Sequence, residues 1–247
     1  MQFDEIKKWK DISLNPNSKD VLEFRRRLLL KARRKELIIN RTDYFCSLAN
    51  GKNVLDVGVV EHFSKSSEDE NWLHGKLCHH SKTCLGVDIL EQEVKVLAAQ
   101  GYNVILWDLT DKALPNKFDL IIVGDVVEHL ENPSALFRNL SHMLQPHGRI
   151  VISTPNPWYV NVVVKNFKKG YPFTDSADHV GWYDASTLCE IASRTGLVLI
   201  KYSGVRTTGA RTFFGRFFLK LASFFVFWGV RPEFFSKTMI YEFALPH

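Results

Sequence analysis

The chain has 247 residues, of which 45% are hydrophobic, and it carries a formal net charge of +5. That length and composition suit one α/β domain with additions or two small domains, and the sequence contains no collagen, coiled-coil or solenoid repeat. Four scattered cysteines form no disulfide framework, and the first ten residues lack the apolar core of a signal peptide. We therefore expect a reduced, cytoplasmic chain.

The positive charge is concentrated in one basic segment near the N-terminus. Seven lysine and arginine residues lie between Arg25 and Lys35, which is more than the net charge of the whole chain, so the remainder is slightly acidic. We expect no nucleic-acid partner for the main domain. An anionic partner, such as the inner face of a membrane, would be met by this segment.

Residues 1–50 are expected to form an N-terminal helical extension. Within it, Ser18 is suited to be the N-cap of a helix that runs to about Ile39. The apolar residues of this helix share one stripe, with the basic residues around it: Val21, Phe24, Leu28 and Ala32. The main domain is expected to occupy residues 51–247.

From residue 53 onward, short apolar runs alternate with helical patterns. The runs that predict strands are 53–57, 84–87, 103–106, 118–123 and 149–153. The patterns that predict helices are 68–80, 91–100, 133–144 and 185–195. Such alternation is typical of βαβ units, and it predicts a mostly parallel sheet with helices on both faces.

Two further strand patterns, 197–204 and 237–245, predict an antiparallel closure of the sheet. Residues 206–235 between them are too many for a hairpin loop and are interpreted as an insertion. Its phenylalanines follow helical spacing from Thr212 to Val230, but a helix of about 16 residues is too short to span a membrane. Three roles stay open: membrane-surface contact or a lid over a lipid-linked acceptor, a homodimer interface, or core packing.

Acidic residues stand at the ends of successive predicted strands. Asp56 and Gly58 close the first strand, Asp88 ends the second and Asp108 follows the third. The carboxyl edge of such a sheet is where α/β folds bind nucleotides. We interpret Asp88 as an acceptor for ribose hydroxyls and Asp108 as an acceptor for an adenine amino group, the alternative being that both cap helices. Apolar residues that follow them would enclose the adenine ring: Ile89 and Leu109.

Two later motifs complete this pattern. Residues 118–130 read Phe-Asp-Leu-Ile-Ile-Val-Gly-Asp-Val-Val-Glu-His-Leu, and residues 144–149 read Leu-Gln-Pro-His-Gly-Arg. With the strand-end residues, this set resembles class I S-adenosylmethionine-dependent methyltransferases over about residues 53–196. It is most similar to the branch with ubiquinone-biosynthesis O-methyltransferases and bacterial surface-glycan methyltransferases. The resemblance implies a Rossmann-like, seven-stranded sheet, mostly parallel with an antiparallel last strand, and S-adenosylmethionine as cofactor.

The glycine-rich loop departs from the family pattern. That pattern usually reads Asp-x-Gly-x-Gly-x-Gly, whereas Val60 and His62 replace the second and third glycines here. Because S-adenosylmethionine has no phosphate for the backbone to approach, we expect the fold to survive and the placement of the methionine tail to change. The cofactor contacts that the resemblance implies are Asp56, Gly58, Val59, His62, Asp88, Ile89, Asp108, Leu109, Gly124 and Asp125.

Asp125, Glu128 and His129 follow the fourth predicted strand, on the edge that faces cofactor and acceptor. His129 is suited to be the general base for an acceptor hydroxyl. Alternatively, the three side chains bind Mg²⁺, as similar clusters in ubiquinone-type methyltransferases do, or they are structural. In similar glycan methyltransferases a histidine at the place of His179 lies over the acceptor, although it can equally anchor a loop. The catalytic candidates are therefore His129, His179 and Glu128.

Several potential zinc ligands lie close together in the sequence. They are His62, Cys78, His79, His80 and Cys84. No CxxC spacing is present, and Cys84 begins a predicted buried strand, so we expect no metal site there.

The function that this pattern predicts is O-methylation of a sugar hydroxyl, on a cell-surface glycan or on its lipid-linked or nucleotide-linked precursor. One alternative is methylation of a quinone-like or other small hydrophobic phenol. Another is a binding subunit without catalysis, which the altered glycine loop suggests. No nucleophile-elbow serine or P-loop supports acyl or phosphoryl transfer.

Overall fold

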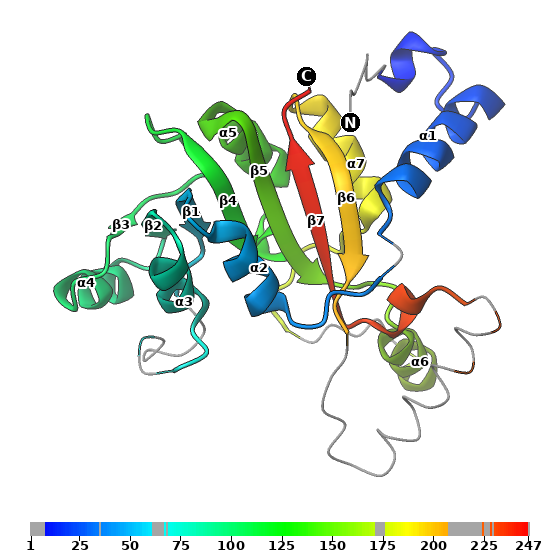
Figure 1. The fold of residues 1–247 in the computed structure, drawn as a ribbon. Coiled ribbons are helices and arrows are strands. Elements are labelled where there is room, and N and C mark those ends of the chain that lie inside the picture. The colour runs from blue at the N-terminus through cyan, green and yellow to red at the C-terminus, as the bar shows by residue number, and fades with distance from the viewer. Residues whose placement is uncertain are drawn as a thin grey trace.

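The computed structural model describes residues 8–34, 36–60, 67, 69–170, 176–206, 224, 228 and 230–246. Its centre is a seven-stranded sheet with the order β3-β2-β1-β4-β5-β7-β6 (Figure 1). The strands are β1 (Asn53–Val57), β2 (Thr83–Asp88), β3 (Val104–Leu106), β4 (Phe118–Gly124), β5 (Leu144–Pro155), β6 (Val198–Gly204) and β7 (Thr238–Ala244). β7 pairs antiparallel with both β5 and β6, whereas the other pairings are parallel. The expected methyltransferase-like sheet is confirmed.

Helices cover both faces of the sheet. They are α1 (Lys19–Ala32), α2 (Arg41–Ala49), α3 (Leu73–His80), α4 (Glu91–Ala99), α5 (Pro133–Met143), α6 (Val160–Lys169) and α7 (Ala185–Arg194). Alternate strand residues pack on opposite layers, because successive side chains point to opposite faces. Val54 and Ile122 share a buried cluster with residues of α2 and α3, and Leu55 and Val123 share one with residues of α5 and α7.

The N-terminal helix is shorter than the sequence predicts. It ends at Ala32, and the next residues run along β6, where Arg34 N–H donates to Tyr202 O at 2.8 Å and Ile38 N–H to Gly204 O at 2.9 Å. This segment therefore covers the outer edge of β6, which would otherwise leave unpaired backbone groups.

Most of the basic segment is paired with carboxylates. Arg25 forms an ion pair with Glu190 of α7, and Arg33 forms one with Glu233 of the short helix η4 (Pro232–Phe235). The more exposed arginines of α1 both pair with Glu23: Arg26 and Arg27. Fewer charges are thus available to an anionic partner than the sequence implies, and contact with a membrane surface stays a prediction.

Other boundaries differ where packing decides them. α3 begins at Leu73 rather than at residue 68, and α2 and α6 were not predicted as separate helices. Most of the aromatic insertion lies outside the described residues, so its helix and its three possible roles stay predictions. In the part of the chain that is described, no helix is long and apolar enough to cross a membrane.

The order of strands places the candidate site. β1 lies between β2 and β4, so the chain leaves the sheet in opposite directions from the neighbouring strands β1 and β4. At such a switch point the loops that follow the strands separate and leave room for a ligand. The loop after β1 and the loop after β4 are therefore the first places to look for a site.

Candidate functional site

Glycine is required at position 58, the first residue after β1, because two loops pack closely at the carboxyl edge of the sheet. Its φ is +79°, which favours glycine, and a Cβ there would lie 2.5 Å from Cγ2 of Val126 in the loop after β4. Its N–H donates to Val87 O of β2 at 2.9 Å. The two loops of the switch point thus approach so closely that only glycine fits at this position.

The residues after Gly58 are held by side chains from outside the loop. The indole N–H of Trp72 donates to Val59 O at 2.8 Å, and Val60 N–H donates to the carboxylate of Asp88 at 2.9 Å. Val59 itself is buried. These contacts fix the loop at Val60, the position of the second glycine in the pattern that the sequence resembles, whereas His62 lies outside the described residues.

Asp88 organises the end of β2. Beyond Val60 N–H, its carboxylate accepts hydrogen bonds from Ile89 N–H at 2.8 Å and Leu90 N–H at 3.1 Å. It is 8% exposed, while Ile89 beside it is 67% exposed. The edge therefore presents a carboxylate oxygen next to an uncovered apolar side chain.

The residues after β3 are divided between surface and core. Asp108 is exposed, and its carboxylate accepts hydrogen bonds from the N–H and the hydroxyl of Thr110, both at 2.7 Å. Leu109 is 3% exposed and packs in the main core cluster, so its side chain does not face the edge. Leu106, the last residue of β3, is 47% exposed and was not among the predicted residues. Its signal was an apolar residue at the end of the strand, two positions before the carboxylate of Asp108.

Asp56 faces α3. Its carboxylate lies 3.0 Å from Nδ1 of His74, and both side chains are buried. Burial lowers the pKa of His74, but hydrogen bonds with Asp56 and Cys78 outweigh burial and raise that pKa to about 9. The imidazole fits because position 86 is glycine: a Cβ there would lie 2.7 Å from Cε1 of His74. His74 was not predicted as a site residue.

Asp125 begins the loop after β4 with a φ of +55°, a conformation that aspartate tolerates better than most residues. Its carboxylate pairs with Arg41 at the start of α2 and accepts a hydrogen bond from the hydroxyl of Ser153 at 3.0 Å. Gly124 precedes Asp125, and a Cβ placed on Gly124 would lie 3.5 Å from Cδ2 of Leu73. Arg41 therefore ties the N-terminal extension to this edge.

Glu128, His129 and His179 converge beside this loop, on the short helix η3 (Val127–His129) and on the segment before α7. Their donor atoms lie within 4.8 Å of one another, and the rings of His129 and His179 are 4.8 Å apart, edge to face. The two distant segments are joined because the backbone N–H groups of Val180 and Gly181 donate to Glu128 O at 2.9 and 3.2 Å.

The side chains of this cluster are positioned by their neighbours. Nδ1 of His129 lies 3.0 Å from the carboxylate of Asp178, and Thr154 donates to Oε2 of Glu128 at 3.0 Å. Oε1 of Glu128 is buried and makes no hydrogen bond within the described residues. Burial, with the negative charge of Asp125 close by, raises the pKa of Glu128 to about 7. A buried oxygen without a partner is costly and points to a ligand.

The magnesium interpretation grouped Asp125 with Glu128 and His129. In the structure the carboxylate of Asp125 is used by Arg41 and Ser153, and the donor that joins Glu128 and His129 is His179. Two imidazoles and one carboxylate suit proton transfer or a transition metal better than Mg²⁺, which prefers oxygen ligands.

A cavity of about 340 Å³ lies past the carboxyl end of β5. Its walls include Trp158, Tyr202 and Tyr241, with Asp184 at the N-terminus of α7. Charged and polar residues also line it, among them Arg231 and Glu233, whereas the three residues of the cluster do not. The cavity thus combines aromatic rings with polar groups, a mixed lining that suits a small molecule.

Comparisons with known proteins agree on one family. A family model described as a methyltransferase domain matches residues 29–202, more than half of the chain. The ubiquinone biosynthesis O-methyltransferase of Aeromonas salmonicida is 24% identical over 162 residues, covering 63% of this chain and 66% of that protein. A protein of the same name from Pseudomonas fluorescens is 30% identical over 128 residues, covering 49% and 51%. The chain thus spans half to two thirds of these curated relatives.

Solved structures share the fold. The magnesium protoporphyrin IX methyltransferase of Synechocystis, with bound SAH, has a TM-score of 0.54 at 17% identity, covering 95% of this chain and 98% of that one. A TehB-like SAM-dependent methyltransferase from Corynebacterium glutamicum has a TM-score of 0.51 at 19% identity, covering 94% and 100%. At these identities the likeness shows the fold alone.

The raised pKa of Glu128 predicts a stability cost at neutral and higher pH. Between the ordinary value of 4.5 and about 7, the folded state keeps a proton that the unfolded chain has lost, so stability falls as the pH rises. Glu128→Gln removes this cost. Relative to the unmodified chain, we expect the variant to gain up to about 3 kcal/mol at pH 8, at about 1.4 kcal/mol per pKa unit, and little at pH 4.

Urea unfolding at both pH values measures this difference. Glu131→Gln, at an exposed position three residues further on, is the matched control and should show no pH-dependent gain. An equal effect of Glu128→Gln at pH 4 and pH 8 would show that folding does not raise the pKa of the Glu128 carboxyl.

Proposed function

The chain belongs to the methyltransferase domain family, and from that premise we propose that it methylates a hydroxyl oxygen of a small acceptor. It is an S-adenosylmethionine-dependent enzyme. When bound, that cofactor supplies a methyl group activated by a positively charged sulfur. The chain itself has to align the acceptor and remove its proton. The cluster of Glu128, His129 and His179 carries the proposal, because it gathers proton acceptors at the carboxyl edge of β4.

We assign the cofactor's nucleoside to the ends of β2 and β3. A carboxylate has about four acceptor positions, and three of those of Asp88 are used by backbone N–H groups, so one is left for a ribose hydroxyl. The exposed side chain of Ile89 offers an apolar surface to the adenine, and Asp108 offers an acceptor to its amino group. Gly58 keeps the neighbouring edge clear of a side chain.

His129 is the residue that we propose as general base. Asp178 accepts from its Nδ1, which orients the ring and leaves Nε2 as the nitrogen that takes the acceptor's proton. His179, at 4.8 Å between ring centres, is proposed to contact the acceptor oxygen. Glu128 lies buried beside both, and in its ionised form, which is favoured above a pKa of about 7, it would stabilise the imidazolium that forms on His129.

Of the two acceptor classes that the sequence predicts, a quinone-like phenol is favoured. The curated relatives carry the name ubiquinone biosynthesis O-methyltransferase, and the cavity past the end of β5 has aromatic rings in its walls that suit a flat apolar molecule. A sugar hydroxyl stays the second candidate. Its supporting observation is Trp158, which is 56% exposed at the cavity and donates to Asp184, a pairing of flat ring and carboxylate that suits a sugar.

Transfer of a labelled methyl group distinguishes these acceptors. Catechols and hydroxylated quinone precursors, with and without a polyprenyl tail, would be compared with polysaccharide and lipid-linked glycan fractions. Labelling of the phenols supports a quinone-like acceptor. Labelling confined to the glycans supports a sugar hydroxyl instead. Membrane contact, a homodimer and a cytoplasmic location stay predictions, because residues 206–235 are largely outside the described part.

Asp88 should contribute directly to cofactor affinity. We expect Asp88→Asn to weaken binding of S-adenosylmethionine by roughly 1–3 kcal/mol, since it loses a charged acceptor and disturbs the N–H of Val60. Isothermal titration calorimetry measures the change. Asp111→Asn, at an exposed carboxylate near the same edge, is the control and should bind normally. Unchanged affinity in a folded Asp88→Asn protein would show that Asp88 does not bind the cofactor.

His129→Ala should reduce turnover by about 10²- to 10⁴-fold if His129 is the base, with cofactor affinity nearly unchanged. Asp178→Asn should reduce turnover less, because the imidazole stays but loses its orienting partner. His142→Ala, an exposed histidine on α5, is the control. Steady-state kinetics on the accepted substrate, with and without a chelator, provide the readout. Full activity in both His129→Ala and His179→Ala would mean that the proton is removed elsewhere.

A further inference from the structure

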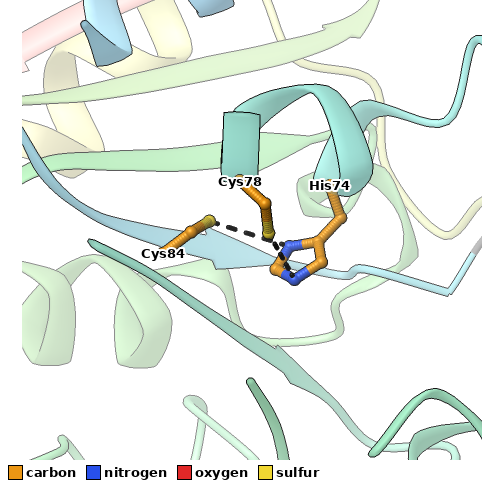
Figure 2. Close-up of side chains that lie close together, drawn as sticks. All are labelled: His74, Cys78 and Cys84. Atoms are coloured by element: carbon orange, nitrogen blue, oxygen red, sulfur yellow. Dashed lines mark hydrogen bonds between the residues drawn. The ribbon is translucent and has the colours of Figure 1, made fainter. Parts of the chain in front are cut away.

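A second cluster lies on the opposite side of β1 from the acceptor residues. It consists of His74 and Cys78, which are four residues apart on α3, and Cys84 on β2 (Figure 2). Residues at this helical spacing share one face, and that face of α3 packs over the start of β2. Cys78 and Cys84 were among the potential zinc ligands in the sequence, where we expected no metal site, but the histidine beside them is His74 rather than His62, His79 or His80.

The distances within this cluster suit one small cation. Sγ of Cys78 lies 3.5 Å from Nε2 of His74, Sγ of Cys84 lies 3.9 Å from Nδ1, and the three donor atoms lie within 4.8 Å of one another. Tetrahedral zinc bonds of about 2.3 Å to sulfur and 2.0 Å to nitrogen separate their ligands by about 3.5 to 3.8 Å. Shifts of an ångström or less would therefore complete three corners of a tetrahedron.

The surroundings hold the imidazole in the orientation that a metal ligand needs. The carboxylate of Asp56, 3.0 Å from Nδ1, accepts a hydrogen bond from that N–H and leaves Nε2, which faces Cys78, as the nitrogen for a cation. Histidine ligands are commonly oriented by a carboxylate in this way. The ring also packs against Trp72, with centroids 5.3 Å apart, and over Gly86, where any Cβ would collide with it.

A fourth ligand position can be filled locally. Oγ of Ser81 is buried without a hydrogen-bond partner in the part of the chain that is described. Ser81 is the residue directly after α3 and lies three residues before Cys84 in the chain. A water molecule on the cation could bind this hydroxyl, which would satisfy a polar atom that otherwise has no partner.

We propose that His74, Cys78 and Cys84 bind one zinc ion, with water as the fourth ligand. Two thiolates and an imidazole select zinc over harder cations such as Mg²⁺. Three protein ligands and a water are the set usual in catalytic zinc sites, but His74 is fully buried and Cys84 nearly so, which keeps a substrate away from the ion and favours a structural role. The ion would fasten α3 to β2 and, through Asp56, to the strand that ends at Gly58. It would thereby keep Trp72 in place on the cofactor loop.

Metal content and stability test this proposal without any measurement of activity. The full chain, purified under reducing conditions, would be stripped with a chelator and titrated with Zn²⁺ and then with Co²⁺. We expect one Zn²⁺ per chain, a higher melting temperature with Zn²⁺, and the thiolate-to-metal charge-transfer absorption of Co²⁺. Cys78→Ala and Cys84→Ala should each lose these effects, whereas Cys189→Ala, at a buried cysteine on α7, should keep them.

Three outcomes would overturn it. One is the absence of stoichiometric Zn²⁺ binding to the reduced chain, and another is binding that survives both Cys78→Ala and Cys84→Ala. The third is a Cys78–Cys84 disulfide in place of the metal, which thiol titration and mass spectrometry would reveal. If the variants do not fold, the Co²⁺ spectrum of the unmodified chain still decides, because it reports thiolate ligands directly. None of these outcomes depends on the methyltransferase reaction.

Discussion

The buried contact between Asp56 and His74 is the interaction on which the rest of the cofactor edge depends. A carboxylate and an imidazole withdrawn from water are tolerated only when they are hydrogen-bonded to each other, so the two side chains fix α3 against β1. With α3 in this place, Trp72 reaches Val59 O, and the loop after β1 takes its shape. The same contact orients the imidazole toward Cys78, so the cofactor loop and the proposed zinc site share one support.

The altered glycine loop is explained by this arrangement. In a glycine-rich loop the backbone is free to adopt conformations closed to other residues, whereas here the loop is fixed from outside. Trp72 holds the carbonyl of Val59, and Asp88 holds the N–H of Val60. Only Gly58 is still required as glycine, because the loop after β4 approaches it through Val126. Valine at position 60 is therefore tolerated without loss of the strand-end geometry.

Much of the fold follows from hydrophobic periodicity, and the details that do not follow depend on tertiary contacts. Alternating strands and helices predicted the parallel sheet and its antiparallel closure, and the helix predicted over residues 133–144 matches α5, which Asn132 caps. The end of α1 at Ala32 could not be read locally, because the chain there follows the edge of β6. α6 was missed although its apolar residues follow helical spacing: Val160, Val163, Val164 and Phe167.

The candidate site shows the same division. His129 and His179 were singled out separately, but their contact depends on the backbone of Glu128, which accepts from Val180 and Gly181. His74 was missed because no rule of spacing links it to Asp56. Its one local signal was Cys78 four residues later, a pair that shares a helix face only once α3 is recognised. Leu109, expected at the adenine, is instead part of the core.

The central claim is that a loop with one remaining glycine still forms an S-adenosylmethionine site. Isothermal titration calorimetry of the unmodified chain with S-adenosylmethionine, and with ATP as a nucleotide of similar adenosine part, tests it most directly. The geometry at Gly58 and Asp88 predicts saturable binding of one S-adenosylmethionine per chain and much weaker binding of ATP, whose phosphates would meet no phosphate-binding loop. Absence of saturable heat with S-adenosylmethionine would contradict the claim.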